Sequence, residues 1–307
     1  MIEQKKEKGK DMNKRKLKFA LFGNIYQAKK SAYVQQVLDV LSSYQADIYI
    51  ESEFYHYISG TLKLDTSKCH IFFGRDFETD IAISMGGDGT FLHAASSVGD
   101  KNIPILGINT GRLGFIADIS PNEIKAMFDA IYSNDYLIEE RTIIQIENQT
   151  HPLDGYPYAL NEVAVLKHDN SSMISVKTFI NGDLLTTYLA DGIIICTPTG
   201  STGYSLSVGG PIMVPRSSTF ALTAIAPHSL NVRPIVFCDD VEVTLVIESR
   251  SRQFLVAIDG RSESCRDKSI LKLKKAPYTL KLIKNKKRKF FNTLREKMMW
   301  GADQRQD

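Results

Sequence analysis

One short motif, in which an apolar run meets a glycine-rich turn, constrains this chain more than any other feature. Asp80–Met85 has the length and composition of a buried strand, and Gly86-Gly87-Asp88-Gly89-Thr90 follows it directly. Thr90–Val98 then has the apolar spacing of a helix. Glycines allow a phosphate to approach the backbone closely, and a helix N-terminus adds unpaired N–H groups. The motif therefore predicts a phosphate-binding turn at the carboxyl end of a strand.

Strands and helices alternate on both sides of this motif. Strand-length runs occur at Lys18–Gly23, Asp47–Glu51 and Pro104–Ile108, and helical stripes at Ser31–Tyr44 and Pro121–Tyr132. Ser120 is a plausible N-cap for the last of these helices. Such alternation predicts a parallel sheet covered on both faces, that is, a Rossmann-like α/β nucleotide-binding domain at residues 18–135.

From residue 136 the pattern changes to short strands separated by Gly, Pro, Asn and Asp. The runs are Ile143–Glu147, Tyr158–Lys167, Met173–Ile180, Gly192–Cys196, Phe220–Ala226, Pro234–Phe237, Val241–Glu248, Phe254–Ile258 and Ser269–Leu273. This spacing predicts a β-rich, sandwich-like domain at 136–275, with a hairpin turn at Asn181-Gly182. Asn285–Trp300 instead has the spacing of an amphipathic helix packed on its neighbours.

Composition excludes several classes of protein. The 307 residues, 43% hydrophobic and 24% charged, are those of a two-domain globular chain. No apolar run approaches the ~20 residues of a membrane span, and the N-terminus lacks the apolar centre of a secretory signal. The spacing of the four cysteines matches no zinc module. We therefore expect reduced thiols in a cytoplasmic protein.

The positive charge is concentrated at the N-terminus. Residues 1–18 contain eight Lys or Arg and three Asp or Glu, although the net charge of the whole chain is only +3. Nucleic-acid binding is one interpretation of such a stretch. No aromatic residue is interleaved for stacking on bases, so we interpret residues 1–17 as a solvated, disordered arm and expect no nucleic-acid partner.

Asp88 needs a chemical explanation, because a carboxylate beside a polyanion site repels the ligand. It can accept the proton of an attacking hydroxyl or hold a metal ion that bridges phosphates. The alternative is a tight turn in which Asp88 caps the following helix. The spacing around it matches neither a P-loop nor the usual Gly-x-Gly-x-x-Gly dinucleotide fingerprint.

Three further segments carry candidate binding residues. In the loop after Pro104–Ile108, Arg112 is placed to neutralise phosphate and Phe115 to line an adenine pocket, unless Phe115 simply fills the core. Asn161-Glu162 can pair with hydroxyls or a base edge. On a regular strand, however, the two side chains would point to opposite faces, and a solvent-facing pair is the alternative.

The third segment, Asp191–Pro211, is the richest. An apolar strand opens into a loop dense in hydroxyl groups and glycine, which offers many donors and acceptors to a polar ligand. Tyr204 adds a ring for stacking. A plain linker is the alternative, but it would rarely lie between such an apolar strand and a Gly-Gly-Pro turn.

Together, Gly86–Thr90, Asn161-Glu162 and Asp191–Pro211 closely resemble the NAD kinase family, in the expected order, over residues 18 to about 260. The resemblance implies transfer of a phosphoryl group from ATP, another triphosphate or polyphosphate to the adenosine 2′-hydroxyl of NAD, giving NADP. It implies Mg²⁺ or another divalent cation with ATP, and a homodimer or homotetramer. It also implies that residues 276–307 pack back on the first domain.

The resemblance also assigns roles to residues, with Asp88 as the general base. The phosphate-facing residues would be Gly86, Gly87, Gly89, Thr90 and Arg112. The NAD-contacting residues would be Asp88, Gly89, His93, Phe115, Asn161, Glu162, Asp191, Thr202, Gly203, Tyr204, Ser205, Leu206 and Ser207. Many relatives have alanine at Gly203, and the residue type varies at His93 and Arg112. Asp259-Gly260 matches another family turn, and a hairpin turn explains it equally well. No side chain is assigned as a metal ligand.

Two other classes of function remain open at this point. Lipid kinases of the diacylglycerol-kinase type share a Gly-Gly-Asp-Gly-Thr turn, but they need a greasy acceptor site or a membrane-facing surface. The hydroxyl-rich Thr197–Ser207 loop fits a polar dinucleotide better, so we expect no membrane partner. A non-catalytic dinucleotide sensor, with its basic arm on DNA, would not need Asp88.

Overall fold

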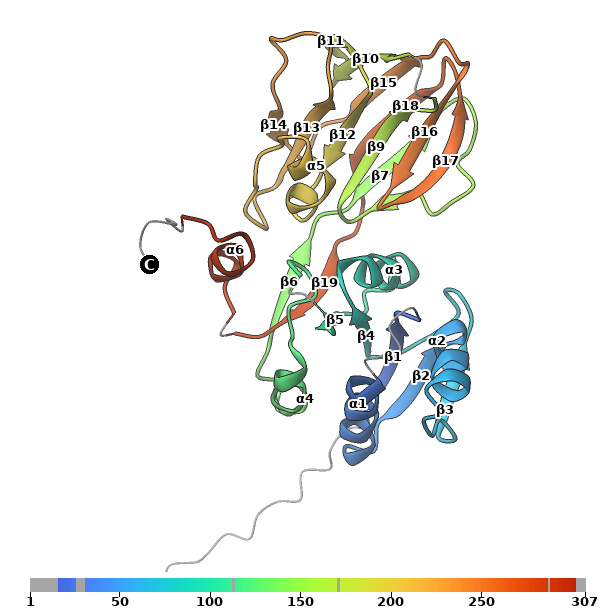
Figure 1. Ribbon diagram of the computed structural model, residues 1–307, viewed down its shortest axis with the longest axis vertical. Helices are drawn as coiled ribbons and strands as arrows, with labels where there is room; N and C mark the ends of the chain where they lie inside the picture. Colours follow the sequence, from blue (N-terminus) through green and yellow to red (C-terminus); the bar gives the residue numbers. More distant parts are fainter. Residues whose placement is uncertain (1–15, 26–30, 112–113, 170–171, 287, 302–307) are drawn as a thin grey trace, which may run out of the picture.

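Two units built on sheets make up the computed structural model (Figure 1). It describes residues 16–25, 31–111, 114–169, 172–286 and 288–301. The predicted N-terminal arm, residues 1–17, lies outside these ranges except for its last two residues. No helix in the described ranges has both the length and the apolar character that crossing a membrane requires.

The first unit, here called the α/β unit, contains a seven-stranded sheet. In spatial order the strands are β3 (Cys69–Phe72), β2 (Asp47–Glu51), β1 (Lys18–Gly23), β4 (Ile81–Gly86), β5 (Ile105–Asn109), β19 (Leu280–Lys284) and β6 (Leu137–Arg141). Neighbouring strands are parallel except for β6, which runs antiparallel to β19. The predicted parallel sheet is therefore confirmed.

Helices cover both faces of this sheet, which explains why β1 is apolar at consecutive positions. Phe19 and Leu21 pack in one cluster with α1 and α4, whereas Ala20 and Phe22 pack on the other face with α3. The α-helices of the unit are α1 (Ser31–Ser43), α2 (Ser52–His56), α3 (Asp88–Val98) and α4 (Ile124–Tyr132). A π-helical turn, η2 (Tyr57–Thr61), follows α2, and a 3-10 turn, η3 (Pro121–Glu123), precedes α4. The predicted N-cap is present there, in a capping box formed by Ser120 and Glu123.

The second unit is a sandwich of two six-stranded antiparallel sheets, as predicted. One sheet has the order β11 (Asp183–Ala190), β10 (Ile174–Ile180), β15 (Val243–Glu248), β18 (Ile270–Lys275), β7 (Ile144–Asn148) and β8 (Tyr158–Ala159). The other has β14 (Ile235–Cys238), β13 (Thr219–Ile225), β12 (Gly192–Cys196), β9 (Glu162–Lys167), β16 (Gln253–Ile258) and β17 (Arg261–Arg266). Asn181 and Gly182 both have positive φ, 50° and 86°, in the predicted β10–β11 hairpin.

β12 is apolar throughout because both of its faces are buried. Ile193 and Ile195 face the core between the two sheets. Ile194 and Cys196 pack on the outer side with Met213, in the segment that follows the 3-10 turn η4 (Gly200–Thr202) and α5 (Tyr204–Ser207). The four cysteines are free thiols, as expected.

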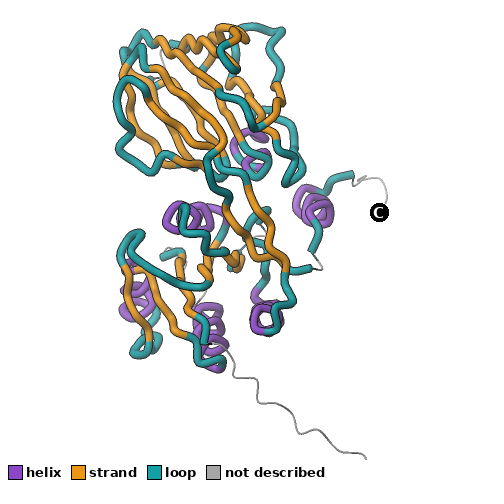
Figure 2. Tube along the Cα trace, turned by 180° about the vertical axis from the view of Figure 1, so that it is seen from behind, coloured by secondary structure: helices purple, strands orange, loops and turns teal. Residues whose placement is uncertain are grey.

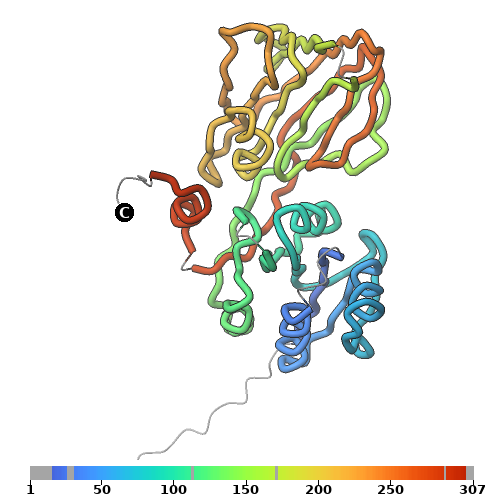
Figure 3. Tube along the Cα trace, viewed as in Figure 1, coloured from blue at the N-terminus to red at the C-terminus, as the bar shows by residue number. Residues whose placement is uncertain are grey.

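The chain passes twice between the units. It leaves the α/β unit through β6 and returns through β19, which pairs with both β5 and β6; Figure 2 shows these two strands from behind. Our sequence boundary at 135/136 falls before β6, although β6 belongs to the first sheet. After β19 the chain forms α6 (Phe290–Met298), which lies at the level of the junction between the units (Figure 3).

Candidate functional site

Asp88 is held in place by a segment almost thirty residues further along the chain. It is the first residue of α3, and Gly87 is the N-cap. Its Oδ2 accepts a hydrogen bond from the Phe115 amide (3.0 Å), and its Oδ1 accepts from the amides of Ile116 (3.3 Å) and Ala117 (3.1 Å). The helix-cap interpretation is therefore wrong, because the carboxylate binds the loop after β5 instead of its own helix.

Glycines make this arrangement possible. A Cβ at Gly114 would lie 2.1 Å from Asp88 Oδ1, so no other residue allows the loop to approach so closely. A Cβ at Gly86 would lie 2.2 Å from Thr90 Oγ1, because the Thr90 side chain folds over the turn. Positions Gly87 and Gly89 face open space. The turn thus leaves room for a ligand to approach its backbone at the start of α3.

A buried ion pair also holds this loop. Lys284 Nζ donates to the Ile116 carbonyl (3.0 Å) and pairs with Asp118 Oδ2 (2.9 Å). Both side chains are buried, at 7% and 8% exposure. Sequence reasoning did not identify either residue, because Lys284 resembled the other lysines of the basic run before α6.

α6 covers Phe115. The Phe115 and Phe290 ring centroids are 6.4 Å apart, and Lys297 Nζ lies 4.5 Å from the centroid of the Phe115 ring. The same Nζ lies 3.8 Å from Asp88 Oδ2. Sequence reasoning placed Phe115 at the adenosine site and did not identify Lys297. Arg112 lies outside the described residues.

The Asn161-Glu162 pair lies at a break between β8 and β9, and Asp259 stabilises this break. The Asp259 carboxylate accepts hydrogen bonds from the amides of Leu160 (2.7 Å), Asn161 (2.8 Å) and Glu162 (3.1 Å). Asp259 and Gly260 have positive φ, 48° and 82°, at the turn between β16 and β17. The Asp-Gly pair is therefore both a hairpin turn and an anchor for the Asn-Glu segment.

Because of this break, both side chains face the hydroxyl-rich loop instead of opposite sides of a strand. A Cβ at Gly203 would lie 3.1 Å from Glu162 Oε2 and 3.5 Å from Asn161 Nδ2. Asn161 is only 8% exposed, so the solvent-facing alternative is wrong. Asn161 Oδ1 and Glu162 Oε2 are buried and have no hydrogen-bond partner among the residues that the structure describes. Unpaired buried oxygens of this kind need an explanation, and a polar ligand supplies one.

Glu162 is also electrostatically unusual. Desolvation by burial, with a smaller contribution from the neighbouring Asp259 carboxylate, raises its pKa to about 8. The side chain is therefore mostly protonated at neutral pH, and can donate one hydrogen bond as well as accept others. A carboxyl group with such a pKa in a cleft marks a candidate functional site.

The loop after β12 packs tightly onto this pair. Thr197 Oγ1 donates to the Leu160 carbonyl (2.6 Å), and a Cβ at Gly200 would lie 2.1 Å from the Asn161 carbonyl oxygen. Tyr204 and Ser207 are exposed, whereas Ser205 is buried with its Oγ 3.4 Å from Thr223 Oγ1. The segment is therefore an ordered part of the site and not a linker, and the Ser205 hydroxyl points to the outer face of the sheet that contains β12 and β13.

Two predicted residues form ion pairs of their own. Asp191 precedes β12 and pairs with Lys167 (2.8 Å), at the opposite end of the strand from Thr197, so the structure does not bring it to Asn161 and Glu162. His93 lies on α3, with Nε2 2.7 Å from Glu51 Oε1. The hydrogen bond to Glu51 raises the pKa of His93.

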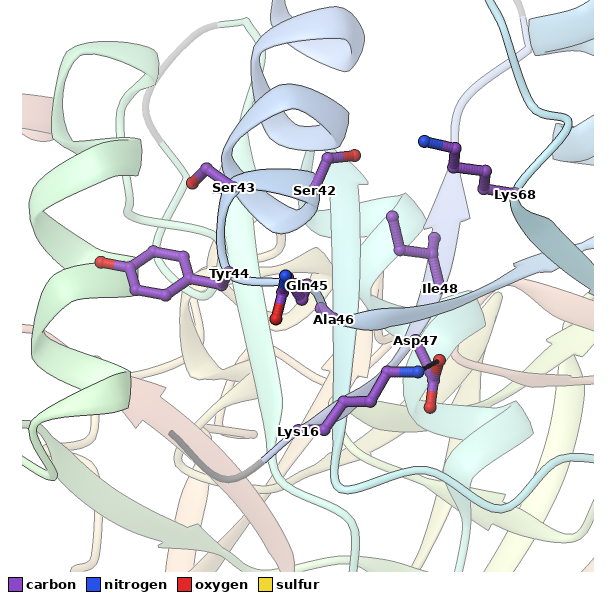
Figure 4. A pocket seen from close by; sticks show the side chains of 9 residues that line it. All are labelled: Lys16, Ser42, Ser43, Tyr44, Gln45, Ala46, Asp47, Ile48 and Lys68. Atoms are coloured by element: carbon purple, nitrogen blue, oxygen red, sulfur yellow. Dashed lines mark ion pairs between the residues drawn. The ribbon is translucent and has the colours of Figure 1, made fainter. Parts of the chain in front are cut away.

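The two halves of the site meet at the junction of the units. Ala95 and Ser96 of α3 line a small internal space together with Leu160 and Asp259. α3 therefore lies against the Asn-Glu turn. A separate polar hollow of about 580 Å³ includes Lys16 and Asp47 (Figure 4). It lies at the amino end of β2, whereas Asp88 follows the carboxyl end of the parallel strand β4.

Family comparisons agree with this geometry. Residues 19–136 match the model of the ATP-NAD kinase N-terminal domain, and residues 160–285 match that of the ATP-NAD kinase C-terminal domain. The chain belongs to the NAD kinase family. α6 lies beyond both matched ranges.

Individual relatives cover nearly the whole chain. The NAD kinase of Bacteroides fragilis is 56% identical over 289 residues, which are 94% of this chain and all of the relative. That of Porphyromonas gingivalis is 40% identical over 93% of this chain and 98% of its own.

Solved structures of the family share the fold. Yeast NADH kinase, complexed with NADH, has a TM-score of 0.85 at 23% identity, over 95% of this chain and 90% of its own. An NAD kinase from Archaeoglobus fulgidus, in complex with ATP, has a TM-score of 0.71 at 25% identity, over 93% of this chain and 100% of its own.

Proposed function

We propose that this chain transfers the terminal phosphoryl group of ATP to the adenosine 2′-hydroxyl of NAD, with Asp88 as the general base. The observation that carries the proposal is the setting of the Asp88 carboxylate. Three loop amides fix its direction, and Oδ2 accepts only one of them, so a lone pair remains for the proton of a hydroxyl. A ribose hydroxyl is a poor nucleophile, and a positioned base assists its attack.

The adenosine end of NAD is proposed to bind at Asn161 and Glu162. Each has a buried oxygen without a partner, and Glu162 is mostly protonated at neutral pH because its pKa is about 8. Together they offer two acceptors and two kinds of donor, which suits a base edge and ribose hydroxyls. His93, Phe115, Thr202, Gly203 and Tyr204 are proposed to complete the site. Ser205, Leu206 and Ser207 of α5 are proposed to bind the rest of the dinucleotide together with Asp191, which lies at the opposite end of β12.

The triphosphate is proposed to bind at the turn formed by Gly87 and Gly89, which face open space at the N-terminus of α3. Its divalent cation, Mg²⁺ in the first place, enters as part of the substrate and needs few protein ligands. In the step itself, the 2′-oxygen forms a bond to the γ-phosphorus, and the bond to the bridging oxygen breaks. ADP leaves with that electron pair, and Asp88 takes the hydroxyl proton.

We also propose that the chain acts in the cytoplasm as a homodimer or homotetramer. The family resemblance supports the assembly, and light scattering of the purified chain tests it. No observation supports the lipid-kinase alternative, and the amide of Asn161, the carboxyl group of Glu162 and the hydroxyl-rich loop suit a polar acceptor.

The deciding experiment incubates the purified chain with NAD, ATP and Mg²⁺ and measures NADP with a glucose-6-phosphate dehydrogenase readout. Asp88→Asn should lose activity by roughly 10²–10⁴-fold, the contribution of a general base, while it keeps its fold and NAD binding. Asp183→Asn, at an exposed Asp that begins β11, serves as the matched control and should keep full activity. A folded Asp88→Asn variant with wild-type kcat would refute the role of Asp88.

If NAD gives no product, NADH and polyphosphate replace the two substrates in turn. A wild-type chain that phosphorylates neither dinucleotide with either donor would refute the proposed reaction itself.

A further inference from the structure

The C-terminal helix brings a cation to the Asp88 carboxylate. α6 is anchored by Thr293 and Leu294, which are 4% and 7% exposed, and by the contact of Phe290 with Phe115. Its last turn places Lys297 Nζ 3.8 Å from Asp88 Oδ2 and 4.5 Å from the Phe115 ring centroid. Among the residues that the structure describes, no other cation lies within ion-pair distance of Asp88.

We propose that Lys297 is a further catalytic residue, which contacts the phosphoryl group as it moves from the donor to the acceptor. This inference rests on the proposed function, because it takes Asp88 Oδ2 as the atom that receives the hydroxyl proton. Lys297 lies on the side of that same oxygen. The other oxygen, Oδ1, is occupied by the amides of Ile116 and Ala117.

Distances support a direct contact. A hydroxyl that gives its proton to Oδ2 must lie about 2.6–3.2 Å from it, and the attacked phosphorus lies about 3–3.5 Å from the hydroxyl oxygen before reaction. An ammonium group 3.8 Å from Oδ2 is therefore within reach of the oxygens on that phosphorus. Those oxygens carry the charge of the transition state.

The Lys297 ammonium group can leave the Asp88 carboxylate for a phosphate, because its contact with the carboxylate is weak. At 3.8 Å it is an ion pair and not a hydrogen bond, and the two side chains are 33% and 30% exposed. An ion pair that is about one third exposed contributes little to stability. The ammonium group can therefore turn from the carboxylate to an incoming phosphate at little energetic cost. A cation–π contact with the Phe115 ring holds the Lys297 ammonium group near this position.

Transfer of a charged phosphoryl group beside Asp88 needs a cation, and the glycine-rich turn contains none. Gly86–Thr90 contains no Lys or Arg, unlike a P-loop, in which lysine belongs to the motif itself. Lys297 supplies the charge from an element beyond both family-model matches. It keeps its proton throughout, because Asp88 receives the proton of the hydroxyl.

The test compares Lys297→Met, Lys297→Arg and Asp88→Asn with wild type. The readouts are kcat, the KM for each substrate, NAD affinity by calorimetry and the unfolding temperature. Lys297→Met should lower kcat by roughly 10²–10³-fold, the effect of removing one group that stabilises transition-state charge. Its NAD affinity and unfolding temperature should stay at wild-type values, and Lys297→Arg should recover most of kcat because it keeps the cation. Lys286→Met is the matched control, because Lys286 is an exposed lysine of the same C-terminal segment and pairs with Asp135 away from the site.

The outcomes separate the two proposals. If Lys297→Met keeps kcat within about threefold of wild type while Asp88→Asn is inactive, Lys297 is not catalytic and the proposed function stands. If kcat falls together with the unfolding temperature and arginine restores neither, Lys297 is structural and the inference is overturned. If the wild type makes no phosphorylated dinucleotide, both proposals fall.

Discussion

Replacing Glu162 with glutamine should change how the stability of this protein depends on pH. In the folded chain, burial and the neighbouring Asp259 carboxylate raise the pKa of Glu162 from 4.5 to about 8. Between these two values the folded state binds more protons than the unfolded state. The free energy of unfolding of the wild type therefore falls as the pH rises from about 4.5 and levels off above about 8.

The magnitude follows from the size of the shift. Each pKa unit corresponds to about 1.4 kcal/mol, so the contribution of Glu162 to stability should fall by about 3 kcal/mol between about pH 6 and pH 8.5. Glutamine has nearly the same shape and does not ionise. The Glu162→Gln variant should lack this loss, and should be more stable than wild type at the higher pH.

Urea unfolding of both proteins at the two pH values, without nucleotide, measures the effect. The quantity of interest is the difference between the two pH-induced changes, because other groups that titrate in this window, such as His93, contribute equally to both proteins. Glu248→Gln, at an exposed Glu that ends β15 of the same sandwich, is the matched control. Parallel pH profiles for wild type and Glu162→Gln would show that the folded chain does not penalise the Glu162 charge, and would refute the argument.

Two further substitutions test how the Asp88 loop is held. Gly114→Ala places a methyl group 2.1 Å from Asp88 Oδ1, so it should displace the carboxylate and reduce kcat by at least about tenfold, with a loss of stability of about 1–3 kcal/mol from overpacking. Gly60→Ala, in open space, is its control, and wild-type kcat in Gly114→Ala would contradict the steric argument. Lys284→Met leaves the buried Asp118 charge unpaired and should destabilise the chain by about 3–5 kcal/mol in urea unfolding. Adding Asp118→Leu should restore part of this loss; a double variant as unstable as the single one would exclude the ion-pair explanation.

Local patterns were enough to predict the two architectures. The alternation of strands and helices over residues 18–135 indicated a parallel sheet, and the structure confirms it. The apolar run Gly192–Cys196 indicated a buried strand, and the structure shows that both faces of β12 are covered. The short β3 and the strands β6, β17 and β19 were not predicted, because polar or charged residues interrupt or flank their few apolar positions.

Contacts between distant segments could not be predicted in the same way. Asp259 lies almost a hundred residues beyond the amides that it binds, and Lys284 more than 160 residues beyond Asp118. No periodicity connects such positions, and only the return of β19 into the first sheet brings Lys284 under the Asp88 loop. The distance of Asp191 from Asn161 and Glu162 could not be predicted either. It adjoins the hydroxyl-rich segment in sequence, but a whole strand separates it from Thr197.

Asp88 and Asp259 are held by the same pattern of hydrogen bonds, but their neighbours differ. Each carboxylate accepts three amide hydrogen bonds from a remote segment, two on one oxygen and one on the other. Asp259 faces the carboxyl group of Glu162, and desolvation is the largest cause of its raised pKa. The Arg261 guanidinium partly opposes this rise in pKa. In the part of the chain that the structure describes, the hydrogen-bond and ion-pair partners of Asp88 include no carboxyl group, and Lys297 lies beside its less occupied oxygen. A reaction that brings a polyanion to a carboxylate needs a cation at that point, so the neighbours of the two residues, and not their hydrogen bonds, make one a structural anchor and the other a candidate base.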